Sequence, residues 1–192
     1  SMITITPETR FIQQLFDRRI SPDNKLGKNE IESTIQMMKE DIKLNSWPKF
    51  SLDVFLKQYP MSQEVSVAEI LNNLFEYYAK KMSGGTEYLG NKKGLYAGGY
   101  GPYTKTIFPN AKFVYIVRDP RDVIRSVLTN FSEQSLKKAA ITYINRCHNI
   151  LKMMKGYPSD TLIVRYEDLV SDYLQEARKI FAFLEEDLTE EI

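Results

Sequence analysis

The chain has 192 residues, of which 43% are apolar and 27% are charged, as is ordinary for a globular domain with its own core. Its formal net charge of +1 gives no bulk field of the kind that marks nucleic-acid-binding or membrane-surface proteins, so any anion site has to be local. No apolar run approaches the about 20 residues that cross a bilayer, no secretory signal is visible, and the lone cysteine fits a reducing compartment, so we expect a cytoplasmic protein without a membrane segment.

The first half of the chain is predicted to be mainly helical. A short β-like alternation opens it and breaks at Pro7. Apolar residues three and four positions apart then predict a helix that begins near Pro7 and Glu8. The apolar face of this helix consists of Phe11, Ile12, Leu15 and Phe16. The same spacing predicts three further helices, over residues 30–44, 51–58 and 66–82.

In the second half, strands alternate with helices, which indicates an α/β fold with a parallel sheet. Residues 86–103 predict a short strand followed by a Gly-rich loop. Two strands of buried type are predicted over 112–117 and 161–165, and two helices over 133–155 and 174–184. Because residues 112–117 are apolar on both faces, we expect helices to cover both sides of the sheet and the fold to have three layers. We expect one helix to turn an apolar stripe to the core, formed by Leu136, Ala140, Tyr143, Cys147, Ile150, Leu151 and Met154. No linker divides the chain, so residues 1–192 are predicted to form a single domain.

Residues 110–126, NAKFVYIVRDPRDVIRS, run a strand directly into a charged turn. Asp119 can cap a helix that begins at Pro120, because a missing N–H costs nothing at the first helical position. That helix N-terminus would lie at the carboxyl edge of the sheet, where open α/β sheets bind ligands and where helix amides favour anions. An arginine fork at Arg118 and the hydroxyl of Ser126 suit a phosphate. Alternatively, the two arginines and two aspartates of the turn only pair with one another, and the residues alone leave both interpretations open.

The longer segment FPNAKFVYIVRDPRDVIRSVL resembles the segment that binds the 3′-phosphate in sulfotransferases that use 3′-phosphoadenosine 5′-phosphosulfate. The resemblance implies this donor, a phosphate-loop-NTPase-like fold, and a phosphate held by Arg118 and Ser126. Residues 162–172, LIVRYEDLVSD, are similar to a second family segment, which implies that Tyr166 lies by the adenine. The two acidic residues after Tyr166 are expected to brace the following turn. A plain edge aromatic is the alternative for Tyr166.

Two shorter segments resemble the Golgi-type branch of that family, which includes the tyrosylprotein sulfotransferases. PETRF resembles the stretch with the catalytic carboxylate and GNKKG the lysine segment, which implies Glu8 as the general base and Lys92 as the catalytic lysine. Sulfuryl transfer needs a base for the acceptor and a cation for the leaving oxygen, and it demands no metal. Alternatively, Glu8 only favours a helix N-terminus and Lys92 is a solvated loop residue. Lys93 and Gly94 replace the threonine and proline of the family pattern.

Nothing in the sequence resembles the Ser- and Thr-rich loop that cradles the 5′-phosphosulfate in the family, and the family domain also continues past the last residue. We therefore expect this domain to be incomplete at both ends and to lack its first strand. A sheet without that strand should have an open edge, which we expect dimer contacts or a rearrangement to cover.

Three functions remain open at this point. The first is transfer of a sulfuryl group to a hydroxyl- or amine-bearing acceptor, with no nucleic acid as partner. The second is a relative or fragment without catalysis that acts as a nucleotide-binding or protein-interaction module, which the missing loop favours. The third is a nucleotide kinase of the related fold, against which the absence of a Gly-Lys-Ser/Thr signature argues.

Overall fold

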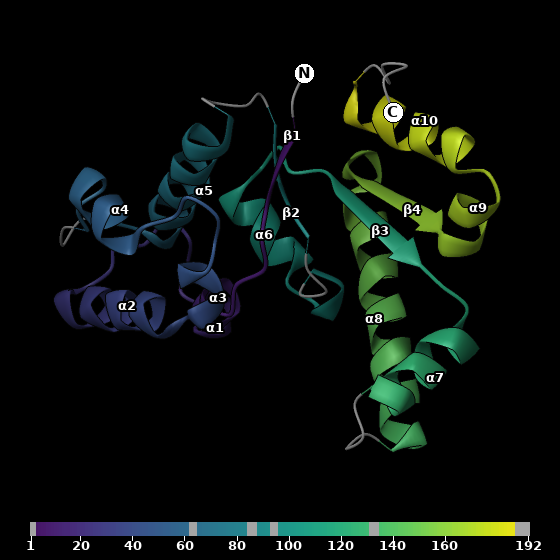
Figure 1. Ribbon diagram of the computed structural model, residues 1–192. Coiled ribbons are helices and arrows are strands. Elements are labelled where there is room, and N and C mark those ends of the chain that lie inside the picture. Colours follow the sequence, from purple (N-terminus) through teal and green to yellow (C-terminus); the bar gives the residue numbers. More distant parts are fainter. Residues whose placement is uncertain (1–2, 62–64, 84–87, 93–95, 131–134, 187–192) are drawn as a thin grey trace. The chain divides into compact units, whose positions relative to one another are not determined.

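The computed structural model describes residues 3–61, 65–83, 88–92, 96–130 and 135–186 (Figure 1). The chain separates into two compact units, an N-terminal unit of residues 1–94 with 106–108 and a C-terminal unit of residues 95–105 with 109–192. Among the described residues, each unit contains one two-stranded parallel sheet. The prediction of a single domain over residues 1–192 stays a prediction.

In the N-terminal unit, the parallel strands β1 (Ile3–Thr6) and β2 (Tyr88–Asn91) pair so that Thr6 lies opposite Asn91. The helices of this unit are α1 (Phe11–Asp17), α2 (Lys28–Glu40), α3 (Ile42–Asn45), α4 (Leu52–Gln58) and α5 (Val67–Ser83). Together with Trp47, which follows α3, their apolar faces form a core that includes Phe11, Ile12, Leu15, Phe16, Met38, Leu44, Phe55, Leu71, Leu74 and Tyr77. The predicted apolar face of the first helix is therefore confirmed.

Two predicted helix boundaries in this unit are wrong, and one side chain explains both. α1 begins at Phe11 and not near Pro7, and the helix predicted over residues 30–44 breaks at Asp41 into α2 and α3. Asp41 has an extended ψ of 93°, and its carboxylate accepts hydrogen bonds from the amides at the starts of both α1 and α3. The break turns Ile42 outward, where it is 84% exposed, although the apolar residues of the predicted helix over 30–44 continue at helical spacing through this position.

In the C-terminal unit, β3 (Phe113–Val117) and β4 (Thr161–Arg165) pair in parallel, as predicted, with Val117 opposite Arg165. The helices of this unit are the 3₁₀ turns η1 (Tyr96–Gly98) and η2 (Pro158–Asp160) and the α-helices α7 (Pro120–Asn130), α8 (Leu136–Gly156), α9 (Tyr166–Ser171) and α10 (Tyr173–Leu184). A short helix α6 (Gly101–Ile107) precedes β3, and its last two residues group with the N-terminal unit. Residues 96–103 thus contain η1 and the start of α6 where a loop was predicted.

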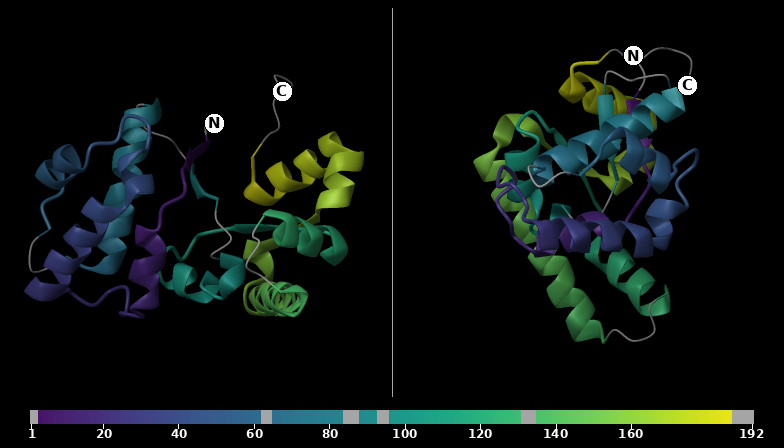
Figure 2. Two further views of the ribbon diagram at one scale, coloured as in Figure 1. Left: turned by 60° about the horizontal axis from the view of Figure 1, so that its bottom comes forward. Right: turned by 90° about the vertical axis from the view of Figure 1, so that its left-hand side faces the viewer.

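Helix α8 covers one face of the β3–β4 sheet, where Ile150 and Met153 pack against Phe113 and Tyr115 (Figure 2). The opposite face is covered only in part, because Val164 of β4 is buried while Ile116 of β3 is 55% exposed. The expectation that helices cover both faces of residues 112–117 is therefore not confirmed at Ile116. Much of the apolar stripe predicted for α8 also points away from this core, since Leu136, Leu151 and Met154 are exposed and Ala139 and Met153 are buried in their place. The chain is a helix-rich, mixed α/β protein with small parallel sheets.

Candidate functional site

The carboxyl ends of β3 and β4 bring two of the predicted binding residues together. Because Val117 lies opposite Arg165 in a parallel pair, the residues that follow them, Arg118 and Tyr166, leave the sheet at the same edge. The guanidinium carbon of Arg118 lies 4.6 Å from the centroid of the Tyr166 ring, within the range of a cation–π contact. Residues 48 positions apart in sequence thus form one cationic and aromatic surface at this edge.

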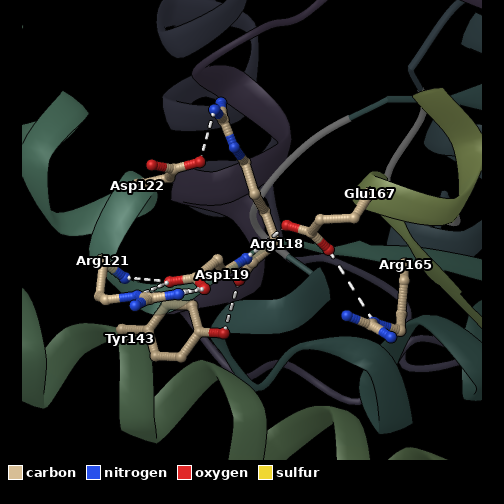
Figure 3. Close-up of polar contacts among 7 residues, drawn as sticks. All are labelled: Arg118, Asp119, Arg121, Asp122, Tyr143, Arg165 and Glu167. Atoms are coloured by element: carbon tan, nitrogen blue, oxygen red, sulfur yellow. Dashed lines mark hydrogen bonds and ion pairs between the residues drawn. The ribbon is translucent and has the colours of Figure 1, made fainter. Parts of the chain in front are cut away.

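The turn between β3 and α7 has the capped geometry that the sequence predicts. Pro120 is the first residue of α7, and the Asp119 carboxylate accepts a hydrogen bond from the Arg121 amide at 2.8 Å. The Arg121 guanidinium also donates to Asp119, at 2.6 Å (Figure 3). These hydrogen bonds with Arg121 lower the pKa of Asp119 to about 2. Asp119 is therefore ionised at neutral pH and stabilises the start of α7.

Arg118 itself makes an ion pair one turn further along, with 2.9 Å between its Nη2 and a carboxylate oxygen of Asp122 (Figure 3). The pairing among arginines and aspartates of the turn, which the sequence left as an alternative to phosphate binding, is therefore present. Both members of the pair are exposed, and the bond uses only part of a guanidinium that has five N–H donors. Such an exposed pair contributes at most about 1 kcal/mol, so it does not commit Arg118 to Asp122 when a stronger anion is present.

Two side chains from other helices fix the backbone of this turn. The hydroxyl of Tyr143, on α8, donates to the Arg118 carbonyl oxygen at 2.8 Å. The Asp119 amide donates to the carboxylate of Glu167, on α9, at 2.8 Å (Figure 3), and this hydrogen bond lowers the pKa of Glu167. From the sequence, Tyr143 was expected in the apolar stripe of a helix. Glu167 was expected to brace the turn that follows Glu167 itself. Glu167 braces the turn after β3 instead, because β3 and β4 end side by side.

Ser126, the second predicted phosphate ligand, lies in the second turn of α7. Its hydroxyl accepts a hydrogen bond from the Asn130 amide group at 3.2 Å, and it is exposed. No hydrogen bond joins Ser126 to Arg118 or Tyr166 within the described residues. The structure thus brings Arg118 and Tyr166 into contact and leaves Ser126 on the adjoining helix.

The carboxyl edge of the β1–β2 sheet presents the two predicted catalytic residues in an equivalent way. Glu8 comes two residues after β1 and Lys92 directly after β2, and the side chains of both are exposed. Beneath them, the Asn91 side-chain amide donates to the Thr6 hydroxyl at 2.7 Å, which in turn donates to the Gly90 carbonyl oxygen at 3.3 Å. This edge is therefore closed by side-chain hydrogen bonds between the two strands, although no ion pair joins Glu8 to Lys92 within the described part of the chain.

Glu8 is held by residues that the sequence did not single out. Its carboxylate lies 3.3 Å from the Lys43 ammonium, and its carbonyl oxygen accepts a hydrogen bond from the Trp47 indole at 3.3 Å. Lys43 lies directly after the break at Asp41, which the predicted helix over residues 30–44 had concealed, and Trp47 follows α3. An aspartate followed directly by a helical pattern is an N-cap signal, and it could have located this break. For Lys92, the structure describes no such partner, and the neighbouring residues 93–95 lie outside the described part of the chain.

The two edges differ in what they can do chemically. The edge at β3–β4 offers a cation, an aromatic ring and a helix N-terminus, which suits an anion linked to a planar base. The edge at β1–β2 offers a carboxylate and a lysine, which suits proton transfer and the stabilisation of a developing negative charge. Within the described ranges, no group of three or more acidic, cysteine or histidine side chains could hold a metal ion. Nor does any helix in these ranges combine the length and the apolar character needed to cross a membrane.

Two solved structures share this fold. The sulfotransferase domain from the Synechococcus PCC 7002 olefin synthase superposes with a TM-score of 0.67 at 18% sequence identity, over 96% of this chain and 64% of that chain. The sulfotransferase domain from the curacin biosynthetic pathway superposes with a TM-score of 0.54 at 20% identity, over 95% of this chain and 62% of that chain. At these identities the likeness establishes the fold alone. The present chain spans a little under two thirds of each of these domains.

Among curated proteins, none is significantly similar to this chain. A family model described as the sulfotransferase family, however, matches residues 1–190 and thus both units of the structure. This match covers the segments on which the resemblance rested, from Glu8 through to Tyr166. The chain belongs to the sulfotransferase family.

Proposed function

We propose that this chain transfers a sulfuryl group from 3′-phosphoadenosine 5′-phosphosulfate to a hydroxyl or amine of an acceptor, and that the nucleotide binds at the carboxyl edge of β3 and β4. The family generally uses this donor. One observation carries the proposal: the Arg118 guanidinium lies 4.6 Å over the Tyr166 ring where the two strands end. A guanidinium beside an aromatic ring is the pairing that a phosphorylated adenosine requires.

The residues at this edge fit the nucleotide. Arg118 and Ser126 offer charged and neutral hydrogen bonds to a 3′-phosphate, and the amides at the start of α7 add their partial positive charge. Arg118 covers one face of Tyr166, whose side chain is still 38% exposed, so ring surface remains for the adenine. The backbone carbonyl of Arg118 is already held by Tyr143, so the arginine approaches the phosphate from a fixed turn.

Phosphate binding requires Arg118 to exchange its partner. In the structure, a carboxylate oxygen of Asp122 lies 2.9 Å from the Nη2 of Arg118, but both side chains of this ion pair are exposed. A phosphomonoester carries about −1.5 to −2 charges at neutral pH, more than the single charge of a carboxylate. We therefore propose that the phosphate displaces Asp122, which costs little because exposed ion pairs are weak.

Glu8 and Lys92 are proposed to act on the transfer itself. The acceptor oxygen or nitrogen forms a bond to sulfur while the bond from sulfur to the bridging oxygen breaks, and the electron pair of that bond stays on the leaving oxygen. Glu8 takes the proton of the acceptor, and the Lys92 ammonium stabilises the charge on the leaving oxygen. Both residues are exposed at the end of a parallel strand. The Glu8 backbone is held by the Trp47 indole and its carboxylate pairs with Lys43, which supports these roles.

Calorimetric titration with 3′-phosphoadenosine 5′-phosphate tests the nucleotide site. Arg118→Ala should weaken binding by about 10- to 100-fold, the value of a hydrogen bond to a charged group. Arg178→Ala, on α10, removes the same charge from the same unit and should bind like the wild type. Equal affinity of Arg118→Ala and wild type would refute the site. Tight binding without any sulfuryl transfer to phenols, alcohols or amines would favour the nucleotide-binding module without catalysis.

The finer parts of the resemblance stay predictions. These are the Golgi-type branch, the missing 5′-phosphosulfate loop, the three-layer arrangement of phosphate-loop type, the cytoplasmic location and the covering of an open sheet edge by a dimer or a rearrangement. Light scattering on the purified chain would address the dimer, because a monomeric mass at micromolar concentration would exclude it.

A further inference from the structure

Asp41 is a buried carboxylate that joins the starts of two helices. Only 4% of the residue is exposed. One carboxylate oxygen accepts a hydrogen bond from the Phe11 amide at 2.6 Å and a short one from the Thr9 hydroxyl. The other accepts hydrogen bonds from the amides of Lys43 at 3.0 Å and Leu44 at 3.2 Å. One side chain thus satisfies amides at the N-termini of α1 and α3, which no backbone carbonyl of those helices can reach.

Two of the groups that Asp41 holds are neighbours of Glu8, one along the chain and one in space. Thr9, the next residue along the chain, is held through its hydroxyl by Asp41. On the other side, Asp41 holds the amide of Lys43, whose ammonium lies 3.3 Å from the Glu8 carboxylate. The four residues Glu8, Thr9, Asp41 and Lys43 therefore form a closed ring of covalent, hydrogen-bonded and ionic links. The Trp47 indole donates a hydrogen bond to the Glu8 carbonyl oxygen.

We propose that Asp41 is the positioning residue for Glu8 in sulfuryl transfer, because it sets both the backbone from which Glu8 projects and the lysine that orients its carboxylate. The proposal rests on the function proposed above, in which Glu8 takes the acceptor proton. An exposed glutamate after a strand end has several rotamers, and a base must lie within hydrogen-bond reach of the proton that it removes. Asp41 restricts Glu8 without contacting the reacting groups.

A carboxylate is required at this position, and an amide cannot replace it. Burial alone would raise the pKa of Asp41, but the hydrogen bonds from Thr9 and from the amides of Phe11 and Leu44 outweigh it and leave the pKa below its ordinary value. Asp41 is therefore ionised at neutral pH and accepts hydrogen bonds through both oxygens. An asparagine has one acceptor oxygen, so it can serve the start of α1 or the start of α3 but not both.

The first test reads the position of Glu8 without any activity. In protein labelled with ¹³C-glutamate, the signal of the Glu8 carboxylate is assigned by its absence in Glu8→Gln. We expect Asp41→Asn to move this signal and Asp53→Asn, an equal charge change at an exposed residue of α4, to leave it in place. An unmoved Glu8 signal in Asp41→Asn would overturn the proposal.

The second test is a double-mutant cycle on the turnover of 3′-phosphoadenosine 5′-phosphosulfate, with a phenol, a primary alcohol and a primary amine offered together as acceptors. Asp41→Asn should lower kcat by about 10- to 100-fold, the effect of misplacing a reacting group by about 1 Å. In the Glu8→Gln background the same change should have almost no further effect on kcat, because there is no base left to misplace. Equal effects of Asp41→Asn in both backgrounds would mean that Asp41 acts on stability alone and would overturn the proposal.

The two tests separate failure of this proposal from failure of the proposed function. The base role of Glu8 is refuted if Glu8→Gln turns over the donor as fast as the wild type, or if neither protein turns over the donor. In both cases the proposed role of Asp41 in catalysis is refuted as well. If Glu8→Gln is slow but the cycle is additive, the function stands and the positioning role is refuted. Should Asp41→Asn fail to fold, Thr9→Val removes one hydroxyl donor at constant shape and should shift the Glu8 signal and lower kcat to a smaller extent.

Discussion

The two units present their candidate residues at equivalent places, the carboxyl edge of a two-stranded parallel sheet, but fix them differently. At the β3–β4 edge, Arg118 and Tyr166 contact each other, and exposed ion pairs surround them. At the β1–β2 edge, the Glu8 carboxylate also has an exposed ion pair, with Lys43, but the backbone on both sides of that pair is held by Asp41, a buried carboxylate. A surface of exchangeable ion pairs suits a ligand that has to bind and leave. A side chain linked to a buried hydrogen-bond network suits a residue that has to stay in place for a chemical step.

Glu8→Gln should have the largest effect, because it removes the proposed base. We expect sulfuryl transfer to fall by about 10²- to 10⁴-fold, the usual contribution of a general base. Affinity for 3′-phosphoadenosine 5′-phosphate should stay unchanged, because the proposed nucleotide contacts are Arg118, Ser126 and Tyr166. Glu32→Gln, an equal change at an exposed residue of α2, is the control for both measurements. A loss of nucleotide affinity in Glu8→Gln would break the division of roles between the two edges.

Asp41→Asn should have the next largest effect, on the free energy of unfolding and its dependence on pH. We expect a loss of about 1–3 kcal/mol at pH 7, the cost of leaving a buried amide donor without its acceptor. Because the folded state lowers the pKa of Asp41, its ionised form stabilises the protein above the ordinary aspartate value of about 3.9 and loses this effect as the pH falls below it. The difference between wild type and Asp41→Asn in urea unfolding should therefore shrink from pH 6 towards pH 2. A difference that stays constant over this range would contradict the account of Asp41.

The smallest effect is expected for Asp122→Asn, which should bind 3′-phosphoadenosine 5′-phosphate more tightly than the wild type. The variant removes the carboxylate that holds the Arg118 guanidinium, so the phosphate no longer has to displace it. Since exposed ion pairs contribute up to about 1 kcal/mol, the gain should be at most about 5-fold. Asp53→Asn makes the same charge change on α4 and serves as the control in the titration. Weaker binding by Asp122→Asn would show that the aspartate orients Arg118 for the nucleotide and does not compete with it.

The parts of the fold that were predictable from the sequence are those that local patterns decide. The strands β3 and β4, their parallel pairing and the capped start of α7 followed from local patterns, namely apolar runs and the Asp-Pro pair. The break at Asp41 did not follow, because apolar residues continue at helical spacing through Ile42. There a long-range interaction decides, since Asp41 stabilises α1 from 30 residues away. Coverage of the sheet at Ile116 likewise depends on where other elements pack, which periodicity cannot specify.

The candidate residues show the same limit. The resemblance selected Arg118 and Tyr166 one segment at a time, and only the register of β3 on β4 places them in contact. No motif indicated that Tyr143 and Glu167 hold the backbone of the turn, because their bonds span 25 and 48 residues. The candidate binding residues lie in sequence motifs that can be recognised locally. The residues that position those binding residues are identified only from tertiary contacts.

The most direct test of the account is to follow backbone amide signals by NMR during titration with 3′-phosphoadenosine 5′-phosphate. We expect the largest shifts in residues 117–126 and 165–167, at the carboxyl edge of β3 and β4 and along α7. We also expect these shifts to be lost in Arg118→Ala and kept in Arg178→Ala. Shifts confined to the N-terminal unit, or no shifts at millimolar nucleotide, would contradict the assignment of the nucleotide site to this edge.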